Sequence, residues 1–171
     1  MLSEEDLLHR IKEGDAHAFE SLYELYKGPV ANLLHRLCFD KQAVDDLMQE
    51  VFIRVWRGSQ TFRGASKVST WIFRIVYNVW AGESRKPRDK PAAVETAGGV
   101  DPADAALAGE RARQVQEAIK SLSENDRVIL LMSEYNGFSY QEISDILGIP
   151  LGTVKSRFFY ALKHLRERLK K

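Results

Sequence analysis

The segment SYQEISDILGIPLGTVKSRFFYALKHLRERL, residues 139–169, decides the fold of the C-terminal part of the chain. Ser139 and Glu142 have the spacing of a capping box, in which each side chain satisfies a free backbone N–H at a helix start. Gly148 and Pro150 end this short helix, because glycine tolerates a left-handed turn and proline disfavours helix in the residue before it. A second helix follows at once, so the segment predicts a helix-turn-helix.

The second helix of this motif begins at about Gly152 and has two different faces. The apolar face, at helical spacing, consists of Val154, Phe158, Ala161, Leu162, Leu165 and Leu169. The outer face consists of Ser156, Phe159, Tyr160 and Lys163. From residue 150 to residue 171, seven basic side chains stand against one acidic side chain. A basic helix of this kind suits the major groove of DNA; the alternative is a solvated basic helix that caps a bundle.

The charge of the whole chain conceals a strong segregation. The net charge is +1 over 171 residues, which permits one domain or two small ones. Residues 1–50 carry 5 basic and 11 acidic side chains, and residues 51–90 carry 9 and 2. Residues 91–149 carry 4 and 10, and residues 150–171 carry 7 and 1. Two basic blocks separated by acidic ones predict two anion-binding surfaces and favour a nucleic-acid-binding protein.

Several other classes of protein are disfavoured by the composition. Cys38 is the one cysteine, which excludes an internal disulfide and a cysteine-cluster metal site, and it is expected in the core. The four histidines lack ligand spacing, and no phosphate-binding loop or nucleophile motif is present, so neither an enzyme nor a cofactor is expected. The chain has no long apolar run and begins with acidic residues, which predicts a cytoplasmic protein without a membrane span.

The pattern of the N-terminal part predicts helices throughout, and therefore an all-α class. Ser3 resembles the cap of a first short helix that ends at Gly14, and Asp15 can cap the next helix. Gly28-Pro29 is expected to break that helix, with Pro29 in the first turn of a third helix.

The helix expected from Lys41 to Arg57 follows Asp40, a suitable N-cap. Its apolar stripe consists of Val44, Leu47, Met48, Val51, Phe52, Val55 and Trp56. The opposite face consists of Asp46, Gln49, Glu50, Ile53 and Arg57. An outward isoleucine within a polar rim is typical of a small protein-docking patch, although a single exposed apolar residue is also ordinary on a surface.

A loop over Gly58–Val68 precedes the next helix, which Ser69 is expected to cap. The loop carries Arg63 and Lys67. The outer face of the helix is expected to consist of Thr70, Trp71, Arg74, Tyr77, Asn78 and Arg85. Aromatic rings can stack on bases and cations can follow phosphates, so this face suits single-stranded nucleic acid. The alternative is that Trp71 and Tyr77 pack against neighbouring helices.

A change of composition divides the chain into two parts. Residues 87–110 are rich in proline, glycine and alanine, which predicts a flexible linker, although part of Ala103–Glu110 can join the following helix. The predicted domains are residues 1–86 and residues 111–171. In the second domain, a helix over Glu124–Tyr135, capped by Ser123, is expected to pack beneath the helix-turn-helix.

Three motifs follow one another along the chain. They are Asp46-Leu47-Met48-Gln49-Glu50-Val51-Phe52 with Trp56, then Thr70-Trp71-Ile72-Phe73-Arg74-Ile75 with Asn78, and finally Gly152-Thr153-Val154-Lys155-Ser156-Arg157. Together, and in this order, they resemble the motifs of the extracytoplasmic-function sigma factors of bacterial RNA polymerase, and the resemblance covers nearly the whole chain. It implies that the first domain corresponds to region two and the second to region four, with region three absent.

The resemblance implies a role for each face. The 46–57 face would dock on the clamp helices of core RNA polymerase. The second face would hold the unwound non-template strand of the minus-ten element, through Arg63, Lys67, Trp71, Arg74, Tyr77, Asn78 and Arg85. The last helix would read the duplex minus-thirty-five element through Thr153, Lys155, Ser156, Arg157, Phe159, Tyr160 and Lys163. An anti-sigma factor is the further partner that the resemblance implies.

The chain departs from the family pattern at three positions. Family members often carry a basic residue at the position of Ser69, aspartate at that of Gly82 and arginine at that of Tyr160. Gly82 should fray the end of its helix, and Tyr160 implies a promoter preference of its own. Two other classes remain as alternatives: a helix-turn-helix repressor or activator that binds duplex DNA alone, and a protein-interaction adaptor.

Overall fold

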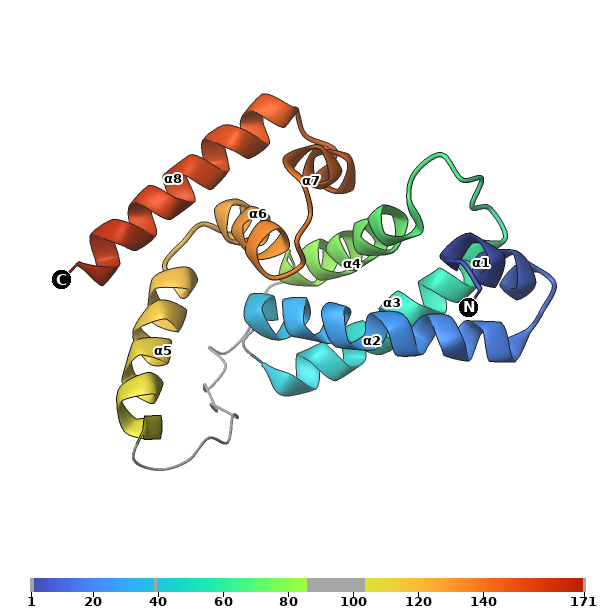
Figure 1. Ribbon diagram of the computed structural model, residues 1–171, viewed down its shortest axis with the longest axis horizontal. Helices are drawn as coiled ribbons and strands as arrows, with labels where there is room; N and C mark the ends of the chain where they lie inside the picture. Colours follow the sequence, from blue (N-terminus) through green and yellow to red (C-terminus); the bar gives the residue numbers. More distant parts are fainter. Residues whose placement is uncertain (1, 39, 86–103, 171) are drawn as a thin grey trace.

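A computed structural model describes residues 2–38, 40–85 and 104–170 of the chain. Within these ranges it contains eight α-helices and no β-strand, which confirms the all-α class. In chain order the helices are α1 (Glu4–Lys12), α2 (Ala16–Cys38), α3 (Lys41–Ser59), α4 (Val68–Ser84), α5 (Asp104–Lys120), α6 (Glu124–Glu134), α7 (Tyr140–Leu147) and α8 (Leu151–Leu169) (Figure 1).

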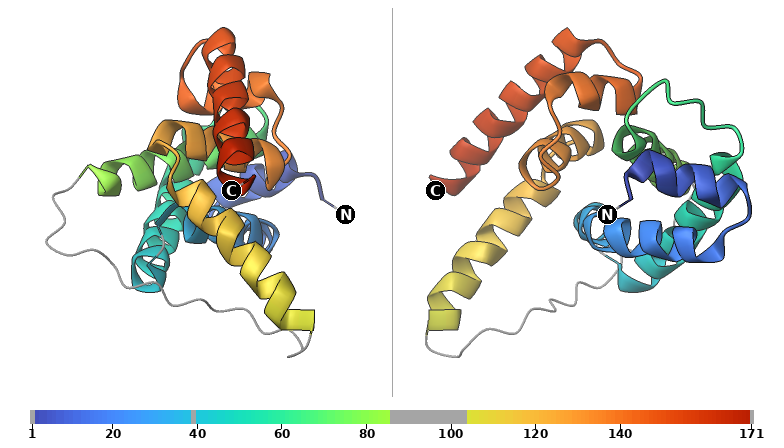
Figure 2. Two further views of the ribbon diagram at one scale, coloured as in Figure 1. Left: turned by 90° about the vertical axis from the view of Figure 1, so that its left-hand side faces the viewer. Right: turned by 45° about the vertical axis from the view of Figure 1, so that its right-hand side comes forward.

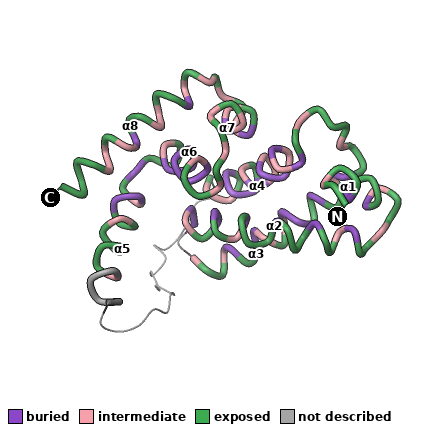
Figure 3. The backbone as a smooth tube through the Cα atoms, viewed as in Figure 1, coloured by how far each residue is buried: buried purple, intermediate pink, exposed green. Residues whose placement is uncertain are grey.

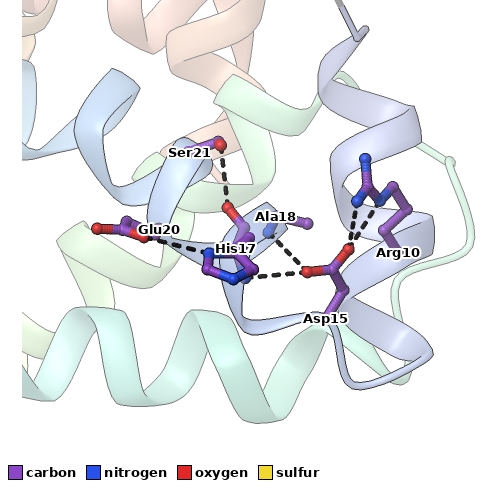
Figure 4. Close-up of polar contacts among 6 residues, drawn as sticks. All are labelled: Arg10, Asp15, His17, Ala18, Glu20 and Ser21. Atoms are coloured by element: carbon purple, nitrogen blue, oxygen red, sulfur yellow. Dashed lines mark hydrogen bonds and ion pairs between the residues drawn. The ribbon is translucent and has the colours of Figure 1, made fainter.

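The junction between α1 and α2 is held by Asp15, as its sequence position predicts (Figure 4). One carboxylate oxygen accepts hydrogen bonds from the backbone N–H groups of His17 and Ala18, at 2.9 and 3.2 Å. The other lies 2.6 Å from an Arg10 guanidinium nitrogen. The bonds from Ala18 and Arg10 hold the pKa of Asp15 below its usual value. A single side chain therefore starts one helix and ties it to the end of the preceding one.

The predicted break at Gly28-Pro29 is wrong, because α2 continues through Pro29 as one helix of 23 residues. Proline inside a helix costs about 3 kcal/mol, since it removes a backbone hydrogen bond and crowds the preceding turn. Here the buried stripe runs without interruption across the proline, from Leu22 and Tyr26 to Val30 and Leu33. Burial of that stripe offsets the local cost, and the continuous helix spans the length of the N-terminal part.

The next two helices differ in how they begin. The Asp40 side chain caps α3 as predicted, by accepting a hydrogen bond from the Gln42 backbone N–H at 3.0 Å. The predicted cap at Ser69 is wrong: α4 begins at Val68, with Lys67 in the N-cap position and no side-chain cap. Thr70, expected on the outer face, is 2% exposed. Burial of Val68 and Thr70 draws the helix start two residues back along the chain.

The C-terminal part contains the predicted helix-turn-helix in α7 and α8. Ser139 and Glu142 form the capping box, and Gly148 has the left-handed φ of 66° that glycine permits. Helix α6 packs beneath α8, as predicted. Leu169, expected on the buried stripe of α8, is exposed because the helix extends beyond its support. Asp104–Glu110 of the predicted linker belongs to α5, and the rest of that linker, residues 87–103, lies outside the described residues.

The two predicted domains contact each other through their helices. Helix α7 packs against α4 and α6 packs against α2, so that α6 and α7 lie between the N-terminal helices and α8 (Figures 1 and 2). Buried residues follow the inner faces of α1–α4, α6 and α7, while most of the outer surface of α8 is exposed (Figure 3). Cys38 is buried as predicted, at the end of α2.

Candidate nucleic-acid interface

The residues predicted on the outer face of α3 lie at the surface. Asp46, Gln49 and Arg57 are exposed, and Ile53 is 38% exposed. Glu50 is partly exposed and lies 2.6 Å from Arg54 Nε, an ion pair within the helix. The face therefore combines one apolar side chain with a charged rim, the composition that a protein-docking patch requires.

Trp56 extends this face, although the sequence pattern assigned it to the buried stripe. Its side chain is 38% exposed, and its ring meets the edge of Phe19 with a centroid separation of 5.1 Å. Trp56 follows Ile53 by three residues, which places both on one side of the helix. This three-residue spacing was the signal in the sequence that could have placed Trp56 on the outer face. The apolar part of the candidate docking face is therefore Ile53 together with Trp56.

The outer face of α4 is less open than its pattern predicts. Asn78 is exposed, whereas Trp71, Arg74 and Tyr77 are each partly buried. The Trp71 ring lies 5.1 Å from that of Phe62, and its Cζ2 atom lies 3.0 Å from the place where a Cβ on Gly58 would stand. The indole therefore packs over the end of α3 and requires glycine there. The alternative in which Trp71 is partly a packing residue is the one that fits this geometry.

The loop between α3 and α4 is anchored to α1. Lys12 Nζ donates to the Phe62 carbonyl at 2.5 Å, and the Gln60 side-chain amide donates to the Lys12 carbonyl at 3.1 Å. Gly64, with φ of 73°, turns the loop beyond this anchor. The exposed Arg63 and Lys67 are thus carried on a loop that is tied down at its start. The sequence pattern did not identify Lys12, because its partner lies fifty residues away.

Two cations of the candidate minus-ten face contact the helix-turn-helix. Lys67 Nζ lies 2.8 Å from a carboxylate oxygen of Glu142, on α7. Two guanidinium nitrogens of Arg74 donate to the backbone carbonyl of Asp145, at 2.9 and 3.2 Å. Arg85, at the end of α4, is exposed. The structure therefore brings part of the α4 face into contact with the second domain.

The residues predicted on the outer face of α8 are exposed to solvent. Phe159 and Tyr160 are 64% and 61% exposed, and Lys155, Ser156 and Lys163 are also exposed. Their phase around the helix is the predicted one. The two rings contact each other with a centroid separation of 5.7 Å, so the centre of the face is an aromatic pair flanked by cations.

Two other residues of the α8 motif point partly inward. Thr153 is partly buried in the first turn. An Arg157 guanidinium nitrogen donates to an Asp126 carboxylate oxygen on α6 at 3.2 Å. Arg157 is therefore in place to orient α8 on α6, and its sequence pattern did not reveal this because Asp126 lies in another helix.

Two kinds of feature are absent from the residues that the structure describes. No group of three or more histidine, cysteine, aspartate or glutamate side chains in that part of the chain could hold a metal ion. None of the helices described is long and apolar enough to cross a membrane.

Comparison with known proteins connects these faces to two family models. Residues 22–88 match the model described as Sigma-70 region 2, and residues 112–165 match the one described as Sigma-70, region 4. The first match includes the candidate faces of α3 and α4. The second includes the helix-turn-helix.

Relatives of similar length match almost the whole chain. The ECF RNA polymerase sigma-E factor of Haemophilus influenzae is 31% identical, covering 98% of this chain and 96% of the relative. The sigma-E factor of Escherichia coli K12 is 34% identical over 94% and 91% of the two chains. The ECF RNA polymerase sigma factor SigW of Bacillus subtilis is 30% identical over 95% of each.

Two solved structures share the fold. CnrH, in complex with the cytosolic domain of CnrY, superposes with a TM-score of 0.77 at 22% identity, covering 98% of this chain and 97% of that one. RpoE of Bartonella quintana, in complex with the anti-sigma factor NepR, gives a TM-score of 0.72 at 24% identity, covering 89% and 96%.

Proposed function

The chain belongs to the extracytoplasmic-function sigma factors of RNA polymerase, and from this premise we propose which of its residues perform each part of promoter recognition. As a member of this family it is a transcription initiation factor that recognises promoters with core RNA polymerase, and it is not an enzyme. The observation that carries the assignment of residues is the presence of three separate faces, on α3, α4 and α8, each with a composition suited to a different partner.

The α3 face is the proposed docking site for core RNA polymerase. Ile53 and Trp56 supply exposed apolar surface, and Asp46, Gln49 and Arg57 supply the polar rim. Buried apolar side chains inside a polar rim are the usual anatomy of a protein interface. Glu50 belongs to the same rim through its ion pair with Arg54.

The α4 face and the loop before it are the proposed binding surface for the melted minus-ten strand. Asn78 is exposed and can reach a base edge, while Arg63, Lys67, Arg74 and Arg85 can contact phosphates. Partly exposed Tyr77 offers a ring edge beside these cations, and Trp71 supports the surface by packing on α3. A surface of cations and aromatic rings is suited to a single strand.

The α8 face is the proposed reader of the minus-thirty-five duplex. Lys155 and Lys163 are the proposed phosphate contacts, and Ser156, Phe159 and Tyr160 lie between them at the centre of the exposed face. Thr153 lies at the N-terminal end of α8, the part of a recognition helix that approaches base edges. Arg157 orients the helix through its bond to Asp126.

The partners of these faces determine where the protein works. Because core polymerase and promoter DNA are its partners, we propose that the protein works in the cytoplasm. We also propose an anti-sigma factor as a regulatory partner, on the basis of family membership.

In vitro transcription with purified core RNA polymerase and a promoter library tests the function. We expect promoter-specific transcripts only when the chain is added. The chain without polymerase should bind promoter duplex weakly in a gel-shift assay. Tight, specific duplex binding by the chain alone, together with no stimulation of transcription, would instead identify a repressor or activator.

Two substitutions on α3 test the docking face directly. Glu50→Lys and Ile53→Asp should weaken association with core polymerase, measured by fluorescence anisotropy with labelled chain. Both side chains lie at the surface, so the free energy of unfolding should change by about 0.5 kcal/mol or less. Glu20→Lys, a charge reversal at an exposed position of α2, is the control and should bind core normally. Normal core affinity in both α3 variants would contradict the docking assignment.

A further inference from the structure

Helix α7 packs across α4, the helix that carries the proposed minus-ten surface (Figures 1 and 2). Lys67, Trp71, Arg74 and Asn78 recur at intervals of four, three and four residues, so they share one face of α4. Lys67 pairs with Glu142 at 2.8 Å, and Arg74 donates to the Asp145 carbonyl at 2.9 Å. Two of the cations proposed for the strand are therefore already bonded within the chain.

Helix α7 presents an oxygen acceptor to each of these cations, one in its first turn and one in its last turn. One Glu142 oxygen accepts from the Ser139 backbone N–H at 2.9 Å, as part of the capping box, and the other accepts from Lys67. Asp145 lies in the last turn of α7, where backbone carbonyls lack helical partners and the helix dipole is negative. Arg74 supplies both a hydrogen-bond donor and a positive charge at that end. Helix α7 thus offers carboxylate and carbonyl oxygens to side chains that would otherwise bind phosphate oxygens.

Apolar and aromatic contacts extend the same interface beside the charged ones. The rings of Phe73 and Phe138 meet edge to face with a centroid separation of 4.8 Å. The Arg36 guanidinium lies 4.0 Å from the centre of the Tyr135 ring. The Asn136 side-chain amide donates to the Pro29 carbonyl at 3.4 Å. Because Phe73 is 1% exposed in this arrangement, separation of the two domains would uncover apolar surface.

We propose that α7 acts as an internal substitute for the minus-ten strand, bonding Lys67 and Arg74 in the free chain so that the helix-turn-helix must move away before the strand can bind. This inference rests on the proposed function of the α4 face, because it concerns regulation of that same surface. Glu142 and the Asp145 carbonyl therefore compete with strand phosphates for Lys67 and Arg74. Core polymerase and the minus-thirty-five duplex, by holding the second domain elsewhere, would release the cations.

Carbodiimide cross-linking tests whether Lys67 contacts Glu142 in the free chain and whether core polymerase breaks this contact. The experiment does not require a known promoter. The carbodiimide adds to a carboxylate oxygen to give an O-acylisourea. The amine of a neighbouring lysine then attacks the carbonyl carbon, so that an amide forms and the reagent leaves as a urea. We expect a Lys67–Glu142 cross-link in the free full-length chain, identified by peptide mass spectrometry, and its loss when core polymerase is bound. The Lys27–Glu24 pair, 2.6 Å apart within α2, should cross-link in both samples and is the internal control. A Lys67–Glu142 cross-link that persists in the core-bound chain would overturn the inference.

A pair of variants tests whether the contact competes with the strand. Glu142→Gln preserves the capping box, since glutamine serves at that position, but removes the charge that faces Lys67. Tyr135→Ala removes the ring beneath Arg36. Each change should raise the affinity of the free chain for single-stranded minus-ten oligonucleotide about two- to five-fold, and the two together on the order of ten-fold. The oligonucleotide is the non-template strand of a promoter selected in the transcription assay.

Asp145→Asn is the matched control for these variants. It removes one negative charge from the same helix, but Arg74 uses the backbone carbonyl of Asp145, while the carboxylate accepts from Gln141 at 3.1 Å. Its strand affinity should equal that of the unaltered chain. If transcription is supported but the double variant binds the strand no better than this control, the inference fails and the proposed function stands. If no promoter is transcribed, the proposed function itself fails.

Discussion

The two faces of this protein that we propose to read DNA are similar in sequence and different in structure. Both combine aromatic residues with lysine or arginine at helical spacing. On α8 the aromatic pair Phe159 and Tyr160 is exposed, and neither ring belongs to the buried core. On α4, Trp71 packs against α3, and two cations contact α7.

The difference follows from what each face is proposed to read. Duplex DNA is available before transcription begins, so a preformed, protruding helix can bind it. The melted strand exists only in the open complex, and bonds of Lys67 and Arg74 to α7 before then make these two cations less available to unrelated anions. A residue pattern therefore indicates a nucleic-acid surface, whereas tertiary contacts set how much of that surface is available.

The largest difference between the faces should appear in stability. Trp71→Ala should lower the free energy of unfolding by about 2–3 kcal/mol, because the ring fills the space above Gly58. Phe159→Ala should change it by about 0.5 kcal/mol or less. Urea unfolding of the two variants measures both values. Equal losses of unfolding free energy in the two variants would mean that Trp71 contributes no more to packing than Phe159 does.

Promoter choice should depend on the α8 face more than on any other. Tyr160→Arg should shift the preferred minus-thirty-five bases toward guanine, because a bidentate arginine–guanine contact is worth about 1–3 kcal/mol of discrimination. Selection from a promoter library by the holoenzyme measures the shift. Asn78→Ala is the counterpart on α4 and should weaken the minus-ten preference only. An unchanged minus-thirty-five preference in the Tyr160 variant would show that this ring faces away from the bases.

A smaller effect should separate phosphate contacts from base contacts. Lys163→Ala should weaken holoenzyme binding about equally for all promoters and lower the salt dependence by about one ion. The measurement is promoter affinity at several salt concentrations. Glu167→Gln, a charge change one turn further along α8, serves as the control and should not lower the salt dependence. A loss confined to one promoter sequence would assign Lys163 to base reading instead.

The smallest effect concerns the pH dependence of the contact between α7 and α4. Hydrogen bonds from Lys67 and from the Ser139 backbone hold the pKa of Glu142 below its usual 4.5. Its ionised form therefore stabilises the folded chain above about pH 4.5, and this contribution is lost as the pH falls through the lowered value. The stability advantage of the unaltered chain over Glu142→Gln should shrink over that acidic range. The measurement is urea unfolding of both chains between pH 6 and pH 3. A difference in unfolding free energy that stays constant over this range would show that ionised Glu142 is not its source.

The sequence predicted two kinds of feature best: where helices begin, and which of their side chains face outward. Asp40 and the Ser139–Glu142 capping box were correctly placed, because a cap depends on residues within one turn of each other. The outward phase of Ile53 and Tyr160 was correct for the same reason: helical periodicity is local. The errors lie where distant packing opposes a local preference, as at Pro29, Ser69 and Thr70.

Local sequence patterns were sufficient to predict an all-helical chain, a C-terminal helix-turn-helix, and basic faces on the helices now identified as α4 and α8. Tertiary structure alone decided that α2 continues through Pro29, that Trp56 joins the exposed α3 face, and that Arg157 turns toward Asp126. It also decided that Lys67 meets Glu142, seventy-five residues away. Caps and periodicity act within about four residues, whereas burial and ion pairing join segments whose proximity no local pattern encodes.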